Sequence, residues 1–136
     1  MSVNLSENLN KVLSSISEKV KLVAVSKTKP IENIEVLYET GQRIFGENRV
    51  EELVEKHESL PKDIEWHMIG HLQSKKTKKI APFISLIHSI DSFKLLVEIN
   101  KEAKKNERII SCLLQFHIAK EKAKYGFSET EGLEII

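Results

Sequence analysis

Apolar residues along the chain switch between a helical spacing and short continuous runs. Near the start, apolar side chains recur three or four residues apart at Leu5, Leu9, Val12, Leu13 and Ile16, which predicts an amphipathic helix. The next run, Lys21–Ser26, is short, apolar and rich in β-branched residues. Such a run is typical of a strand that is buried on both faces.

The same alternation continues through most of the chain. Further helices are predicted from Pro30 to Gly41, from about Arg49 to Ser59, from about Ser74 to Ile80, and from a cap at Asp91 or Ser92 to about Lys105. Further strands are predicted over Arg43–Phe45, Glu65–Ile69, Leu86–Ile90 and Ile109–Phe116. About five strands alternating with helices predict an α/β fold with a parallel sheet, either part of a (β/α)8 TIM-type barrel or an open doubly wound sheet.

The end of the sequence favours the barrel. Ser128 and Glu131 have the spacing of a capping box, which begins a helix, and only about two turns follow it. We therefore expect residues 1–136 to form a single domain that corresponds to the N-terminal portion of a larger barrel. A five-stranded open sheet that ends in a short helix is the alternative.

Composition narrows the class of protein. The chain has 136 residues, of which 40% are hydrophobic, and only five Gly and three Pro, which excludes disordered and collagen-like chains. A net charge of +1 gives no general attraction to nucleic acid or to an acidic membrane. No apolar window has the length of a membrane span, and the N-terminus lacks the order of a signal peptide. We expect a cytoplasmic protein.

The only cysteine, Cys112, lies in an apolar run of the last predicted strand. A single cysteine rules out an internal disulfide framework, which fits a reducing compartment. We expect a buried and chemically inert thiol.

Lys27 directly follows the first predicted strand. Side chains alternate across a strand, so Lys27 shares a face with Val23 and Val25 and is expected to project from a buried strand end. A lysine amine in an apolar wall beside another cation is deprotonated more easily, and the neutral amine forms Schiff bases with aldehydes. Lys29 would supply that cation. The alternative is a lysine that simply enters solvent where a strand ends.

A second polar segment, Gly46–Arg49, follows the second predicted strand. Gly46 permits close approach of the backbone, and Asn48 offers both a donor and an acceptor at the same end of the sheet as Lys27. The segment is a candidate site loop. It is equally typical of a turn in which Asn48 caps the next helix.

Two histidines, His67 and His71, fall on one side of the third predicted strand. Imidazoles bind metals, but no Cys or acidic residue completes a ligand set at metal-site spacing, and the directions of His88 and His117 are open. We expect no metal site. A histidine that lines an organic-ligand pocket, or an ordinary hydrogen-bonded one, is the favoured interpretation.

Four lysines fall within the segment Lys75–Lys79. Such a run can attract phosphate or RNA, but it more often forms a solvated helix face. The segment contains no aromatic residue on which a base could stack. We expect no nucleic-acid partner.

Four segments together resemble the pyridoxal phosphate homeostasis protein family, whose members are single-domain relatives of the alanine racemase N-terminal barrel. These segments are Ala24–Pro30, Phe45–Glu52, Trp66–Ser74 and His88–Ser92, and Lys124–Phe127 resembles the family's segment after strand five. The stretch Leu72–Lys76 departs from the family at Lys75, where the family has Asn. The family's later segments, which hold the phosphate and the ring, have no counterpart in this sequence.

The resemblance implies a binder of pyridoxal 5'-phosphate that acts in homeostasis of this cofactor. It implies Lys27 as the Schiff-base lysine, with Asn48, His67 and Ser89 as further cofactor-binding residues. It also implies binding and delivery rather than a defined turnover reaction. An amino-acid racemase-like enzyme and a non-enzymatic RNA-binding fragment are the alternatives. An incomplete barrel would expose its interior and edges, so a homodimer is also expected.

Overall fold

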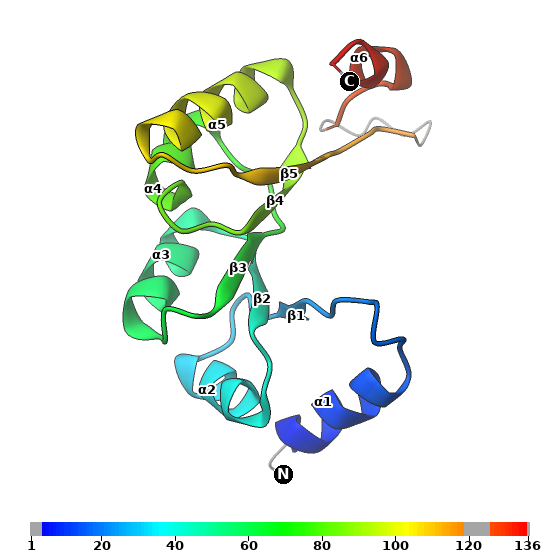
Figure 1. The fold of residues 1–136 in the computed structure, drawn as a ribbon, viewed down its shortest axis with the longest axis vertical. Coiled ribbons are helices and arrows are strands. Elements are labelled where there is room, and N and C mark those ends of the chain that lie inside the picture. The colour runs from blue at the N-terminus through cyan, green and yellow to red at the C-terminus, as the bar shows by residue number, and fades with distance from the viewer. Residues whose placement is uncertain (1–3, 119–125, 136) are drawn as a thin grey trace.

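The computed structural model describes residues 4–118 and 126–135. The elements run in the order α1 (Leu5–Ser14), β1 (Ala24–Val25), α2 (Ile31–Thr40), β2 (Ile44–Glu47), α3 (Val50–Ser59), β3 (Glu65–Met68), the 3₁₀ turn η1 (Ser74–Lys76), α4 (Thr77–Ile80), β4 (Leu86–Ile90), α5 (Phe93–Lys105), β5 (Ser111–Leu114) and α6 (Glu129–Ile135). Figure 1 shows their arrangement. The predicted alternation of helices and strands is confirmed.

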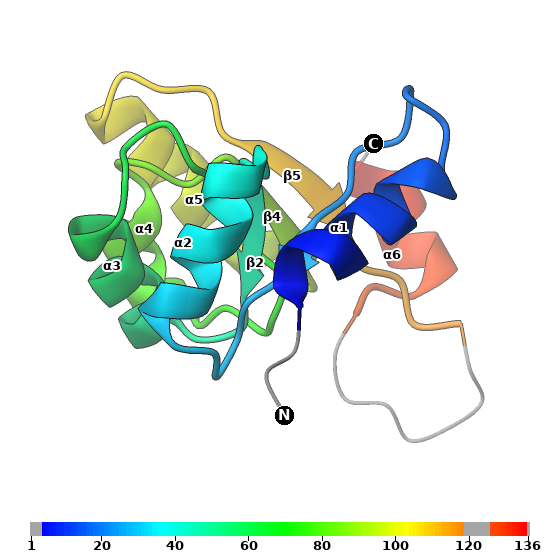
Figure 2. The same cartoon turned by 90° about the horizontal axis from the view of Figure 1, so that it is seen from below.

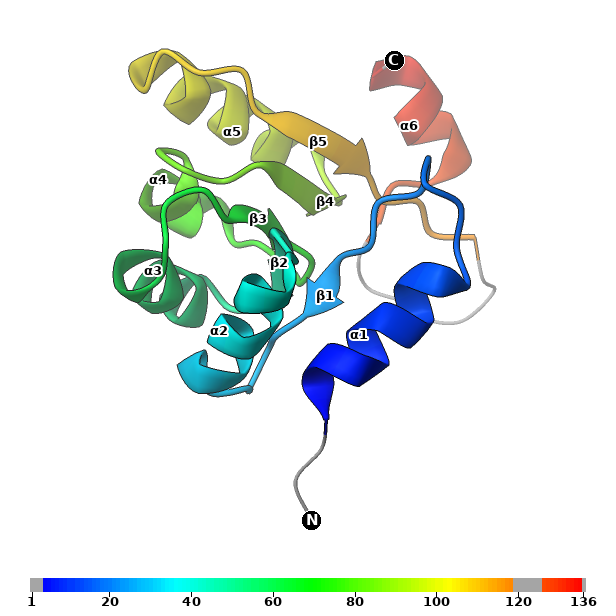
Figure 3. The same cartoon turned by 60° about the horizontal axis from the view of Figure 1, so that its bottom comes forward.

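The five strands form one parallel sheet in the order β1-β2-β3-β4-β5. Helices α2 to α5 lie along one face of this sheet, and α1 and α6 lie beyond its two edge strands (Figures 1 and 3). A doubly wound sheet reverses its strand order at a switch point and has helices on both faces. The sequential order with helices on one face is that of a partial (β/α)8 barrel, which decides between the two predicted architectures.

The core lies between the sheet and helices α2 to α5. Phe45, Trp66 and Ile87 are buried on the face of the sheet that the helices cover. Each of the four helices adds a buried apolar side chain to them: Ile34, Leu53, Ile80 and Leu95. The core is therefore one-sided, and the other face of the sheet is the interior face of the partial barrel.

The first strand differs from the prediction. It spans only Ala24–Val25 instead of Lys21–Ser26, and Val25 is 55% exposed. The expectation that this strand is buried on both faces is wrong. Val25 points to the interior face, which none of the described helices α2 to α5 covers, and β1 is an edge strand of the described sheet.

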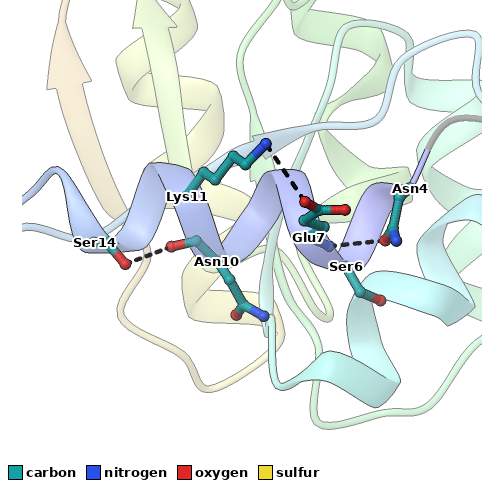
Figure 4. Close-up of a pocket in the computed structure, with 6 residues that line it drawn as sticks. All are labelled: Asn4, Ser6, Glu7, Asn10, Lys11 and Ser14. Carbon is teal, nitrogen blue, oxygen red and sulfur yellow. Dashed lines mark hydrogen bonds and ion pairs between the residues drawn. The ribbon is translucent and has the colours of Figure 1, made fainter.

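Helix α1 is held by polar contacts along its own surface (Figure 4). The Asn4 side chain accepts the Glu7 N–H at 2.9 Å and caps the helix, and Glu7 pairs with Lys11 one turn later. The helix ends at Ser14, before the Ile16 of the predicted stripe. The pocket in Figure 4 is lined by residues of α1 and its cap: Asn4, Ser6, Glu7, Asn10, Lys11 and Ser14.

The ends of the other helices and strands agree with local sequence signals, with two corrections. Gly41 ends α2 with φ of 114°, and the Ser92 hydroxyl caps α5 at the Leu95 N–H, as predicted. Strand β2 continues through Glu47, so Gly46 belongs to the strand rather than to a loop. Arg49, not Asn48, is the residue before α3, and no side chain caps that helix.

The capping box at the start of α6 is confirmed. The Glu131 N–H donates to the Ser128 hydroxyl at 3.1 Å, and the Ser128 N–H donates to the Glu131 carboxylate at 3.4 Å. Across the described part of the chain, no helix has both the length and the apolar character that a membrane span requires.

Candidate functional site

Lys27 lies at the carboxyl end of β1, in the turn that leads to α2. Its side chain is exposed, and so is that of Val25 in the strand before it. We expected Lys27 to project from a buried strand end, and this expectation is wrong because the end of the strand is exposed. Lys27 is at the expected end of the sheet, where the functional groups of parallel barrels gather.

Val23 and Ile69 place apolar side chains over Gly46 of strand β2. Gly46 pairs with Val25 on one side and with His67 on the other. A Cβ at Gly46 would lie 3.0 Å from a methyl carbon of Val23 and 3.0 Å from one of Ile69. The missing side chain of Gly46 lets these two apolar groups approach the backbone of β2.

Asn48, Gly70 and Ser89 come together at the carboxyl ends of β2, β3 and β4. Asn48 is half-buried, and its backbone lies directly against Gly70. The buried Ser89 donates its hydroxyl to the Gly70 carbonyl. Ser89 therefore supports the backbone beside Asn48. The structure brings these two predicted site residues to one rim.

His67 is buried and forms a pair with His88 of the next strand. Their ring nitrogens Nδ1 and Nε2 are 3.0 Å apart. Burial, the neighbouring His88 and the charge of Lys21 lower the pKa of His67 to about 4, and burial also lowers the pKa of His88. Both imidazoles are therefore neutral at pH 7, when one donates a hydrogen bond to the other.

His67 and His71 do not act together. His71 follows the end of β3, and its Nδ1 lies 3.1 Å from the Asp91 carboxylate. Within residues 4–118 and 126–135, no group of three or more His, Cys, Asp or Glu is arranged to hold a metal ion.

A buried polar network under the Lys27 turn was not predicted. The Lys56 ammonium of α3 donates to the Ser26 carbonyl at 2.7 Å, to Glu47 at 3.0 Å and to Glu52 at 2.7 Å. Glu47 also accepts the Ser26 hydroxyl. The available signal was Glu52 and Lys56 at the i,i+4 spacing that pairs charges on a helix. Nothing local indicated that this pair faces β1.

Burial and hydrogen bonds shift the pKa values of the two carboxyl groups in this network in opposite directions. Glu47 is fully buried, and burial raises its pKa above the ordinary value although Ser26 and Lys56 donate to it. Burial also raises the pKa of Glu52, but hydrogen bonds from Lys56 and from the Thr28 N–H outweigh it and leave the pKa of Glu52 below its ordinary value. Glu52 is thus the firmly ionised partner of Lys56.

The remaining candidates lie away from this rim. In the basic run, Lys76 pairs with Glu51 at 2.6 Å and Thr77 is buried, so the four lysines do not form one uninterrupted cationic face. Cys112 is half-buried rather than fully buried, and burial raises the pKa of its thiol, which keeps it protonated. Lys124 and Tyr125 lie outside the described residues.

The rim residues have the chemistry of a site for an organic aldehyde. Lys27 offers a primary amine, Asn48 an amide, and Val23 and Ile69 apolar side chains that lie over Gly46 of the strand between β1 and β3. An exposed amine and an apolar surface at the same end of a sheet are groups that suit an aromatic aldehyde such as pyridoxal 5'-phosphate. In barrels of this kind the phosphate site commonly follows strands seven and eight, beyond the five strands described.

Comparison with known sequences shows the family of this chain. Residues 2–136 match the family described as alanine racemase, N-terminal domain. The chain is 37% identical to the pyridoxal phosphate homeostasis protein of Haemophilus influenzae over 98% of its own length, and 37% identical to the human protein of that name over 85%. It spans 62% of the Haemophilus protein and 46% of the human protein.

Solved structures show the same likeness. PipY of Synechococcus elongatus with pyridoxal phosphate bound matches with a TM-score of 0.86 and 34% identity, over 94% of this chain and 60% of PipY. An alanine racemase of Clostridium difficile matches with a TM-score of 0.78 over 97% of this chain and 35% of the racemase, but at 17% identity this likeness concerns the fold alone. The chain therefore belongs to the alanine racemase N-terminal domain family, and within that family it is similar to the pyridoxal phosphate homeostasis proteins.

Proposed function

We propose that this chain binds pyridoxal 5'-phosphate, that it serves in homeostasis of the cofactor, and that Lys27 carries the covalent link. The neutral Lys27 amine would attack the aldehyde carbon, a C=N bond would form, and one water would leave. The ammonium form of the lysine must first release a proton to solvent, which reaches the exposed side chain. The bound cofactor supplies a conjugated ring that absorbs visible light when it is joined to an amine.

The other rim residues would hold the ring rather than react. Asn48 is half-buried at the carboxyl end of the sheet, the same end at which Lys27 follows β1, and its amide can both donate and accept a hydrogen bond. His67 offers a neutral imidazole on the interior face, already bonded to His88. Ser89 would contribute through Gly70, whose carbonyl its hydroxyl binds. Residues 1–136 would act as one domain in this role.

One observation carries the proposal: a lysine at the carboxyl end of β1 in a chain that is 34% identical to a protein solved with pyridoxal phosphate bound. Lys29 lies in the same turn and is the matched control. The test is to add pyridoxal 5'-phosphate to the wild-type chain, to Lys27→Met and to Lys29→Met, to reduce each with borohydride, and to map the labelled peptides.

The wild type and Lys29→Met should gain visible absorption and a reduced adduct on Lys27. Lys27→Met should lose most of both. Recovery of the adduct mainly on Lys29 or within Lys75–Lys79 would refute the assignment of Lys27. If no protein gains absorption at millimolar cofactor, the chain is not a binder.

The family match with alanine racemase supports a second candidate, a racemase-like enzyme. The two functions separate when L-alanine or D-alanine is added to the cofactor complex. Appearance of the opposite enantiomer faster than with free cofactor would favour the enzyme. A binding and delivery protein should show no such excess.

A further inference from the structure

The turn that carries Lys27 is held from the side of helix α3. The Glu52 carboxylate accepts the Thr28 N–H at 2.6 Å, and the Lys56 ammonium donates to the Ser26 carbonyl at 2.7 Å. These two contacts flank Lys27 on either side. The Ser26 carbonyl also accepts the Lys29 N–H at 3.1 Å, which closes the turn.

The backbone of this turn needs such support. Thr28 has φ of 63°, in the left-handed region, where a β-branched residue is an uncommon and strained choice. Strained backbone persists only where surrounding contacts over-determine it. Glu52 binds the N–H of the strained residue itself.

The buried network also makes Lys56 and Lys27 differ in their accessibility to a carbonyl compound. Lys56 is 5% exposed, and its ammonium donates to Ser26, Glu47 and Glu52. An ammonium has three N–H donors, so these three contacts use all of them. Lys27 is exposed in the turn above. Lys56 is thus held as a structural cation, while Lys27 remains accessible for reaction.

We infer that Glu52 and Lys56 are positioning residues, which fix the Ser26–Lys29 turn so that the Lys27 amine is presented at the rim of the sheet. This inference rests on the proposed function for the role of Lys27. Glu47 completes the arrangement, because it holds both the Ser26 hydroxyl and Lys56 in the buried layer beneath the turn.

The test uses Glu52→Ala, with Glu55→Ala as the matched control. Glu55 is exposed on the same helix, one turn from Glu52 and not in contact with the turn through any of the hydrogen bonds above. The first readout needs no cofactor: amide hydrogen exchange at Thr28 and Lys29, relative to amides of β3. We expect exchange there to rise about tenfold in Glu52→Ala and to stay unchanged in Glu55→Ala. Glu52→Gln keeps an acceptor for the Thr28 N–H and should restore part of the protection.

The second readout is the ratio of Lys27 to Lys29 labelled by pyridoxal and borohydride, measured where the amides of β3 show that the variant is as folded as the wild type. We expect this ratio to fall about tenfold in Glu52→Ala only. Unchanged exchange at Thr28, or an unchanged ratio despite faster exchange, would overturn the inference. If Lys27 is not labelled even in the wild type while exchange still rises, the proposed function fails and the anchoring of the turn stands. Should Glu52→Ala not fold, Glu52→Gln against Glu55→Gln replaces it, with a smaller expected rise in exchange at Thr28, because glutamine keeps the acceptor and loses only the charge that holds Lys56.

Discussion

Gly70 lies so close to Asn48 that no side chain fits between their backbones. A Cβ at Gly70 would be 2.5 Å from the Asn48 carbonyl oxygen and 2.8 Å from its Cα. The Ser89 hydroxyl holds the Gly70 carbonyl from the other side. The position of Asn48 at the rim therefore depends on a glycine in the neighbouring strand's loop.

This contact predicts that Gly70→Ala displaces the Asn48 backbone. The variant should lose roughly 1–3 kcal/mol of stability, the usual cost of overpacking, and should bind pyridoxal phosphate several-fold more weakly. Gly41→Ala is the control, because Gly41 has open space around it and only a positive φ of 114°. It should cost about 1 kcal/mol and leave cofactor binding unchanged. Urea unfolding and cofactor titration measure both effects, and equal binding by the two variants would contradict the argument.

The His67 imidazole predicts a pH dependence of folding. The pKa of His67 is about 4 in the fold and about 6.5 in an unfolded chain. Between these values the unfolded state binds the extra proton, so stability is full above pH 6.5 and falls as the pH drops toward 4. The loss between pH 7 and pH 4 should be on the order of 3 kcal/mol. His67→Gln should flatten this part of the curve in urea unfolding from pH 4 to 7. A wild-type slope that persists in the variant would show that other groups are responsible.

We predict weaker cofactor binding by this chain than by PipY. The chain matches 60% of PipY, and the five strands described end before the strands whose loops commonly hold the phosphate in such barrels. The phosphate carries much of the cofactor's charge, so binding is weaker where no loops hold the phosphate. Side-by-side titration should give a shallower curve here. Pyridoxal without phosphate should bind this chain nearly as well as pyridoxal phosphate, whereas equal and tight binding of the phosphate form by both proteins would refute the prediction.

We propose that a protein of these 136 residues self-associates. Val25 is 55% exposed and Leu113 is 48% exposed on the sheet, and β1 and β5 are its edge strands among the residues described. Exposed apolar surface and open edges favour pairing with a second copy. Light scattering should report more than 15.6 kDa at micromolar concentration, and Leu113→Glu should shift the mass toward one chain. A cooperatively folding wild-type monomer would contradict this proposal.

The sequence alone determined the elements and their class. Residues that act within one turn of their own position settled the helix ends: Gly41 after α2, Ser92 before α5, and Ser128 with Glu131 at α6. The run of apolar strands between helices was enough to predict a parallel sheet. It also placed Lys27 and Asn48 at one end of that sheet, because the carboxyl ends of parallel strands lie together.

The tertiary structure decided which groups meet and which face is covered. His67 contacts His88, 21 residues away, rather than His71 on its own segment, because register and strand order bring them together. Val25 is exposed because the described helices α2 to α5 cover only the other face of the sheet, which apolar spacing within one strand does not specify. The contact of Lys56 with Ser26 joins residues 30 positions apart. Spacing along the chain fixes neighbours within an element, whereas contacts between elements depend on how all of them pack at once.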